Sequence, residues 1–100
     1  MKKTPRFTIK TVHSRVARYL KRCEKRVLVE FEGALEHICS GPFPSDDPVH
    51  ITHLKGPFHC SYRYVLAKGK RGLRILYDVD VEAREITVYE FGPRGDVYKG

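Results

Sequence analysis

Three arginines lie in or beside the predicted strands of the C-terminal half of the chain, at Arg63, Arg74 and Arg94. A strand that only packs against a hydrophobic core rarely contains permanently charged side chains. The planar guanidinium group donates paired hydrogen bonds to phosphate oxygens, and it stays charged throughout the physiological pH range. These residues therefore predict a phosphate-binding surface. The alternative is that each arginine pairs with a nearby acid, at Asp78, Asp80, Glu85 or Glu90.

Tyr98 follows Arg94 by four residues and adds possible acid–base chemistry. A phenol can donate or accept a proton, and cationic surroundings lower its pKa. Together with the three arginines, Tyr98 is suited to stabilise a phosphate that is attacked by the neighbouring 2′-hydroxyl of RNA. Four aromatic residues are candidates for stacking on RNA bases: Phe58, Tyr62, Tyr64 and Tyr89.

Histidines and cysteines suggest two competing chemistries, and both are less favoured. His50, His53, His59 and Cys60 lack the tight paired spacing of zinc sites, so we expect no metal and no cofactor. Cys60 beside His59 is the one candidate thiolate, whereas Cys23 and Cys39 fall in an apolar pattern typical of core residues. Phosphate-loop, dinucleotide-binding and nucleophile-elbow motifs are absent.

Charge is unevenly distributed along the 100 residues, which carry a net charge of +7. Residues 1–26 hold ten Lys or Arg and one acid, residues 27–54 hold five acids and no Lys or Arg, and residues 55–74 are again basic. This segregation favours a polyanion or an acidic protein as partner. We expect one domain, 1–100, located in the cytoplasm, since three widely spaced cysteines indicate free thiols and no segment could cross a membrane.

Apolar periodicity predicts an N-terminal strand over 7–12 and helical structure over 14–39, as one long helix or as two, with Ser14 as a candidate cap. A proline-rich loop over 41–57 follows, with a brief extended piece at 50–54. Strands are then predicted over 62–66, 73–81 and 85–91, with Leu73, Ile75, Tyr77, Val79 and Val81 on one face of the second. A hairpin loop at 68–72 and a turn at 80–84 join them. In the last strand, Ile86 and Val88 should lie on one face, and Thr87, Tyr89 and Phe91 on the other.

Four short motifs in this half of the chain resemble the RelE/ParE toxin superfamily. They are Leu54-Lys55-Gly56, Tyr62-Arg63, Arg74-Ile75-Leu76-Tyr77 and Arg94-Gly95-Asp96-Val97-Tyr98. The N-terminal strand and helical segment agree as well, so the resemblance extends over nearly the whole chain. It implies an α+β fold in which a helical hairpin packs on a mainly antiparallel four-stranded sheet.

The resemblance also implies a function. RelE-like members are toxins of type II toxin–antitoxin systems that cleave mRNA on the ribosome without a metal and thereby inhibit translation, and an antitoxin protein neutralises them. By position, Arg63, Arg74, Arg94 and Tyr98 match the catalytic residues. Lys55 matches a residue that contacts the RNA backbone, and the hairpin adds further RNA-binding candidates at Lys68, Lys70 and Arg71.

The chain also departs from the RelE pattern at two positions. Val65 stands where active RelE-like proteins have Lys, and Pro93 stands where a basic residue or His is common. Two alternatives to an active endoribonuclease therefore stay open. One is a ParE-like inhibitor of DNA gyrase, and the other is a catalytically weak domain that binds RNA or an antitoxin.

Overall fold

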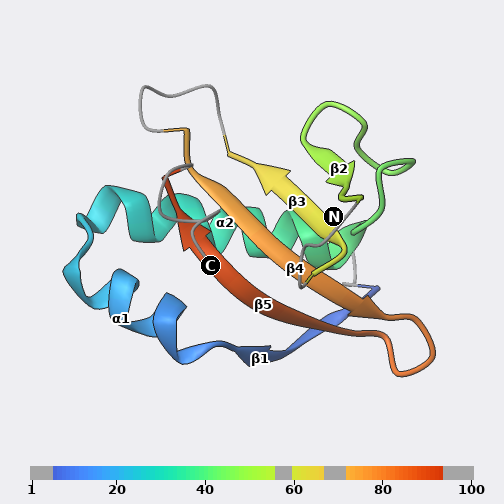
Figure 1. The fold of residues 1–100 in the computed structure, drawn as a ribbon, viewed down its shortest axis with the longest axis horizontal. Helices are drawn as coiled ribbons and strands as arrows, with labels where there is room; N and C mark the ends of the chain where they lie inside the picture. The colour runs from blue at the N-terminus through green and yellow to red at the C-terminus, as the bar shows by residue number, and fades with distance from the viewer. Residues whose placement is uncertain (1–5, 56–59, 67–71, 94–100) are drawn as a thin grey trace, which may run out of the picture.

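The computed structural model describes residues 6–55, 60–66 and 72–93 of the chain. In these ranges the elements are β1 (Thr8–Val12), α1 (Ser14–Arg22), α2 (Lys25–Ser40), β2 (Ile51–His53), β3 (Tyr62–Val65), β4 (Arg74–Asp80) and β5 (Glu85–Gly92). The strands form one sheet in the order β1-β5-β4-β3-β2. Helix α2 lies across one face of the sheet and α1 lies beside one end of it, whereas neither helix covers the face that is turned to the viewer in Figure 1. This second face is called the open face below.

The sheet is mainly antiparallel, as predicted, but it has five strands and one parallel pair, so the prediction of four strands is wrong. The segment at Ile51–His53 is a strand of its own and pairs with β3. Strand β1 runs parallel to β5, while the pairs β2–β3, β3–β4 and β4–β5 are antiparallel. A parallel pair needs a long connection between its strands, and both helices lie between β1 and β5 in the chain.

The helical segment forms two helices. Cys23 and Glu24 have extended backbone, which ends α1 and begins α2. The N-cap of α1 is His13 and not the predicted Ser14, since the His13 side chain accepts a hydrogen bond from the Arg15 backbone N–H. The predicted apolar stripe of α2 is buried, at Val27, Phe31, Ala34 and Ile38.

The core lies between α2 and the covered face of the sheet. Ile75 and Tyr77 of β4 point into it together with Ile86 and Val88 of β5. Phe91 also lies in this core, so its predicted placement opposite Ile86 and Val88 is wrong. The reason is a register shift between Leu76 and Tyr77, because Leu76 pairs with Glu90 and Tyr77 pairs with Val88. The extra residue in β5 reverses the alternation of its faces.

A buried hydrogen bond joins the middle of the sheet to the loop after α2. The Tyr77 hydroxyl donates to the carbonyl oxygen of Pro42 over 2.7 Å. Burial, with smaller contributions from Tyr62, Tyr64, Asp47 and Asp46, raises the pKa of Tyr77 well above its ordinary value, so this hydroxyl keeps its proton.

A polar cluster fixes the same loop to α2. Asp47 Oδ2 lies 2.7 Å from Nε2 of His37 and 2.8 Å from Nδ1 of His50. The His50 ring in turn stacks on Tyr64 of β3, with 5.4 Å between ring centroids. Burial of the Asp47 carboxyl opposes its ionisation, but the hydrogen bonds from His50 and His37 outweigh this effect and lower the pKa below 3.8. The cluster therefore connects helix, loop and sheet.

In the described ranges, no helix is both long enough and apolar enough to cross a membrane.

We predict that Tyr77→Phe lowers the free energy of unfolding by about 1–2 kcal/mol, because it leaves the buried Pro42 carbonyl without its donor. Urea denaturation followed by circular dichroism measures this. Tyr62→Phe is the matched control, since the Tyr62 ring stacks on Tyr77 but its hydroxyl has no hydrogen-bond partner in the described structure. The control should change the free energy of unfolding by less than about 0.5 kcal/mol. Equal effects of the two substitutions would contradict the assigned role of the bond.

We also predict that the stabilising effect of Asp47 depends on pH. A carboxyl whose pKa is lowered by folding stabilises the fold above its unfolded pKa, and this effect disappears as pH falls through the folded pKa. Asp47→Asn should therefore lower the urea midpoint at pH 7, and the difference from wild type should shrink as the pH falls below about 4. A difference that is constant between pH 7 and pH 2 would be inconsistent with this linkage.

Candidate nucleic-acid interface

Strand register places Arg63 and Arg74 on the open face of the sheet. Arg63 is opposite Leu76, and Arg74 is opposite Val65. Residues that are directly opposite share a face, as do residues two apart in one strand, so all four side chains lie on the same side. The two arginines are diagonal neighbours, at a distance of about 7–8 Å. The structure thus brings together the two predicted strand arginines that it describes.

The guanidinium of Arg74 is held by the backbone just before its strand. Its Nη1 donates to the Gly72 carbonyl oxygen over 2.6 Å. Gly72 has a φ of +55°, a left-handed conformation that favours glycine. A Cβ at this position would lie 3.0 Å from Arg74 Nη1. Glycine at position 72 therefore permits both this backbone conformation and the position of the arginine. The Arg74 Nε is buried and has no hydrogen-bond partner in the described structure.

Arg63 contacts the neighbouring strand β2. Its Nη2 lies 3.5 Å from the Thr52 hydroxyl oxygen, and Thr52 is its direct partner in the register. Lys55 follows β2 by two residues and is exposed. Arg63 therefore extends the cationic character of the open face toward β2.

The remaining predicted site residues fall outside the described ranges: Arg94, Tyr98, Lys68, Lys70 and Arg71. Of the two departures from the RelE pattern, Val65 is half-buried directly opposite Arg74, where it contributes no charge. Pro93 follows β5 and is also half-buried.

Two of the aromatic residues that were predicted to stack on bases lie on the covered face of the sheet and not on the open face. Tyr64 is buried and Tyr62 is half-buried, and both pack against the core beneath α2, since they alternate with Arg63 along β3. Tyr62 contacts Phe43 and Tyr77 there. Tyr89 lies on the open side and packs against Leu76 and Cys60. Phe58 is outside the described ranges.

The thiol and metal alternatives receive no support from the described residues. Burial and, to a lesser extent, the carboxylates of Asp78 and Glu90 raise the pKa of Cys60 to about 12. This thiol is therefore protonated at neutral pH and is a poor nucleophile. No group of three or more His, Cys, Asp or Glu side chains suited to a metal ion occurs in the described part of the chain.

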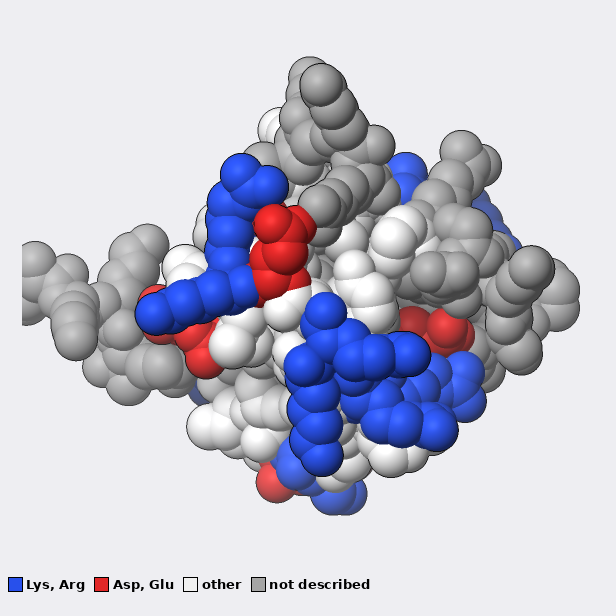
Figure 2. Space-filling model, turned by 90° about the vertical axis from the view of Figure 1, so that its left-hand side faces the viewer, with Lys and Arg blue, Asp and Glu red and all other residues white. Residues whose placement is uncertain are grey.

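Helix α1 adds a cationic feature that the strand-based reasoning missed. Arg15 Nη1 lies 3.8 Å from Oε1 of Glu90, whose side chain is 5% exposed. Glu90 pairs with Leu76 across β4 and β5, so this ion pair connects α1 to the open face. Lys and Arg side chains gather on the side of the molecule formed by α1 and the start of α2 (Figure 2). The ten Lys and Arg residues in 1–26 are the sequence feature from which this cationic side could have been predicted.

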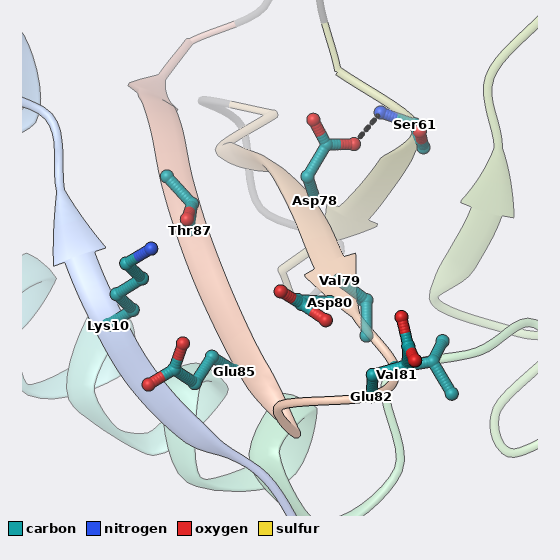
Figure 3. A pocket seen from close by; sticks show the side chains of 9 residues that line it. All are labelled: Lys10, Ser61, Asp78, Val79, Asp80, Val81, Glu82, Glu85 and Thr87. Atoms are coloured by element: carbon teal, nitrogen blue, oxygen red, sulfur yellow. Dashed lines mark hydrogen bonds between the residues drawn. The ribbon is translucent and has the colours of Figure 1, made fainter.

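The far end of the open face is acidic. A hollow of about 540 Å³ beside the β4–β5 hairpin is lined by four carboxylates, Asp78, Asp80, Glu82 and Glu85, and by a single cation, Lys10. Figure 3 shows that the side chains of Lys10, Asp80 and Glu85 extend to the same side of the sheet. Asp78 accepts a hydrogen bond from the Ser61 backbone N–H over 2.7 Å. The open face is therefore electrostatically divided, with cations at one end and carboxylates at the other.

We predict that Gly72→Ala destabilises the protein by about 1–2 kcal/mol, because alanine at positive φ is strained. The added Cβ should also displace the Arg74 guanidinium, so affinity for single-stranded RNA should fall. Gly33→Ala is the matched control, since no heavy atom lies within 4 Å of the Cβ position in the middle of α2. Alanine there should stabilise the helix by about 0.5–1 kcal/mol and leave RNA binding unchanged. Urea unfolding and fluorescence anisotropy measure the two effects, and wild-type behaviour of Gly72→Ala would contradict the assigned role.

Comparison with known proteins identifies the fold. No protein-family model matches the sequence, and no curated protein matches it. The structure is similar to a chain of the archaeal RelE–RelB complex from Pyrococcus horikoshii OT3, with a TM-score of 0.52 and 22% sequence identity, over 90% of this chain and 97% of that chain. At this level of identity the similarity establishes the fold alone. The expectation of a RelE-like α+β fold is thus confirmed at the level of architecture.

Proposed function

We propose that this chain is the toxin of a type II toxin–antitoxin system and that it cleaves mRNA on the ribosome. The observation that carries the proposal is the placement of Arg63 and Arg74 side by side on the open face of a RelE-like sheet. By the sequence resemblance, Arg63 matches a basic residue that acts on the phosphate, and Arg74 matches the arginine that stabilises the transition state. The exposed Lys55 and the net charge of +7 fit a polyanionic substrate.

The proposed reaction needs no metal. The 2′-hydroxyl oxygen of a ribose attacks the adjacent phosphorus, the bond to the 5′-oxygen of the next nucleotide breaks, and a 2′,3′-cyclic phosphate forms. One group must accept the proton of the 2′-hydroxyl and another must supply a proton to the 5′-oxygen. Arg63 and Arg74 would stabilise the charge that develops on the phosphate oxygens. Arg94 would add a third cation, and Tyr98 is the candidate proton donor or acceptor.

The fixed position of Arg74 supports its part in this reaction. Electrostatic stabilisation is most effective when the donor is already oriented before the substrate binds. The hydrogen bond to Gly72 holds one edge of the guanidinium, and the Nε of the same side chain is buried. Val65 supplies no second cation opposite Arg74, so the hairpin cations Lys68, Lys70 and Arg71 are the candidates for that contribution.

An antitoxin protein is the second proposed partner. The similar structure is a complex of RelE with RelB. In the present chain, the open face combines basic side chains with the buried pair Cys60 and Leu76, against which Leu54 and Tyr89 pack. An acidic, partly disordered segment that folds on binding would match such a surface in charge.

We predict that replacing both Arg74 and Arg94 by alanine abolishes growth arrest when the chain is expressed from an inducible promoter. Loss of an oriented electrostatic stabiliser lowers the rate of a catalysed step by about 10²–10³-fold. Primer extension on cellular mRNA should show cleavage with wild type and none with the double variant. Lys10→Gln with Arg84→Asn is the matched control, since it removes two positive charges at the acidic end of the sheet.

Two outcomes would contradict this function. If the Arg74/Arg94 double variant arrests growth as strongly as wild type at equal protein level, the assigned roles are wrong. If wild type leaves mRNA intact but inhibits DNA supercoiling by purified gyrase, the protein is a gyrase inhibitor of the ParE kind and not an endoribonuclease.

A further inference from the structure

The outward side of helix α1 is a continuous cationic surface. Arg15, Arg18, Lys21 and Arg22 are all exposed and line a shallow hollow of about 460 Å³. We call these four residues the α1 basic surface. Helix α1, which carries them, lies on the side of the molecule that is turned to the viewer in Figure 2, where basic side chains gather. From Arg15 to Arg22 the helix advances by about 10 Å, which is enough to contact more than one phosphate of a nucleic-acid strand.

Most of this charge is not neutralised within the described structure. Arg15 is paired with Glu90, but no ion pair joins Arg18, Lys21 or Arg22 to an acid in the described ranges. The first turn of α1 contains no acid either. Exposed cations on one helix face repel one another, so the protein bears a small energetic cost that an anionic ligand would relieve.

The α1 basic surface is continuous with the arginine end of the sheet. Arg15 contacts Glu90, Glu90 and Gly92 lie two residues apart on the open side of β5, and Gly92 is the direct partner of Arg74. Two residues of a strand span about 7 Å. An RNA strand that is bound through a phosphate at Arg74 therefore has only a short distance to cover before it reaches α1.

In the other direction the open face is unfavourable for phosphates. Asp80 lies six residues beyond Arg74 along β4, a distance of about 20 Å, and the acidic hollow surrounds it. This distance exceeds the screening length of about 8 Å at physiological salt, so Asp80 does not cancel the charge of Arg74. Asp78 is a diagonal neighbour of Arg63 and weakens the attraction of phosphates at that side of the arginine pair. The carboxylates of the hollow repel phosphates locally. The charge distribution thus gives a preferred direction across the sheet.

We propose that an RNA strand bound at Arg63 and Arg74 continues over the α1 basic surface and away from the β4–β5 hairpin. The α1 basic surface holds the strand through its phosphates and does not read its bases, since Tyr19, the one aromatic residue of α1, packs its ring against Phe91. RNA as the occupant rests on the proposed function, whereas the preference for phosphates follows from the charges themselves.

A protein partner fits the same surface less well. A helix or strand that docks on a protein is usually anchored by apolar side chains in a groove. The outward residues of α1 are polar or basic apart from Ala17, and Val16 is fully buried. Phosphate contacts need no apolar anchor, so the surface favours a nucleic-acid backbone over a folded peptide segment.

The test measures how salt weakens the binding of a 12-nucleotide RNA of mixed sequence. The RNA carries 2′-O-methyl groups, so it cannot be cleaved during the measurement. For single strands, the slope of log affinity against log salt is about −0.7 for each phosphate contact. Arg18→Gln with Arg22→Gln should reduce the magnitude of this slope by about 1.4, since it removes two contacts. Arg15 is retained because of its ion pair with Glu90.

The matched control is Lys10→Gln with Arg84→Asn. It lowers the net charge by the same two units at the opposite end of the sheet, and asparagine suits the φ of 57° at position 84. The control should keep the wild-type slope. An unchanged slope in the α1 variant, or an equal reduction in both variants, would overturn the proposed path. Circular dichroism is used to check that each variant is folded.

Two further outcomes are distinguishable. If a 20-residue polyglutamate binds through Arg18 and Arg22 while the RNA slope is unchanged, the surface belongs to an acidic protein segment and the RNA path is wrong. If the slope falls as expected but wild type cuts no mRNA, the path is upheld and the proposed function fails. Binding and cleavage thus test the two proposals separately.

Discussion

The register between β3 and β4 determines which side chains the sheet exposes. It places Tyr64 and Ile75 against the core and Arg63 and Arg74 on the open face, because alternate residues of a strand point to opposite sides. A slip of one residue would turn one of the two strands over, which would bury its guanidinium group beneath α2 and expose its core side chains. The core therefore enforces the position of the cations, since the free energy of burying Ile75 and Tyr77 depends on the same register. The register of β3 and β4 thus determines both the packing of the core and the position of the two arginines.

The charged side chains divide the open face into a cationic end and an acidic end. Arg74 begins β4 and Asp80 ends it, so one strand presents opposite charges at its two ends. The bulge in β5 contributes to this arrangement, because it places Glu90 on the open side and leaves Phe91 in the core. Glu90 in turn holds Arg15 of α1. A local irregularity of one strand thereby attaches a helix to the cationic end of the sheet.

The sequence predicted much of this structure where the signal was local. The apolar stripe of α2 identified its buried residues, since the helical period depends on the chain itself. The predicted apolar face of β4 was right at Ile75 and Tyr77 but wrong at Val81, which is exposed in the turn after the strand. The parallel pairing of β1 with β5 was missed, because it joins residues some 75 positions apart and leaves no local pattern. The bulge was missed for a related reason, since it is defined by the partner strand. Because the bulge was missed, Phe91 was predicted on the open face instead of in the core. The two tyrosines of β3 were predicted to stack on RNA from their residue type alone, without regard to the face of the strand on which they lie.

The pairing of the first strand with the last has a consequence for synthesis of the protein. Strand β1 leaves the ribosome early, but its partner β5 spans Glu85–Gly92 and is made near the end of the described chain. Contacts between distant parts of a chain form slowly and only after both parts are available. The sheet is therefore incomplete during most of translation, with the edge of β1 unpaired. The parallel pairing of β1 with β5 therefore forms only in the last stage of synthesis, after β5 has emerged.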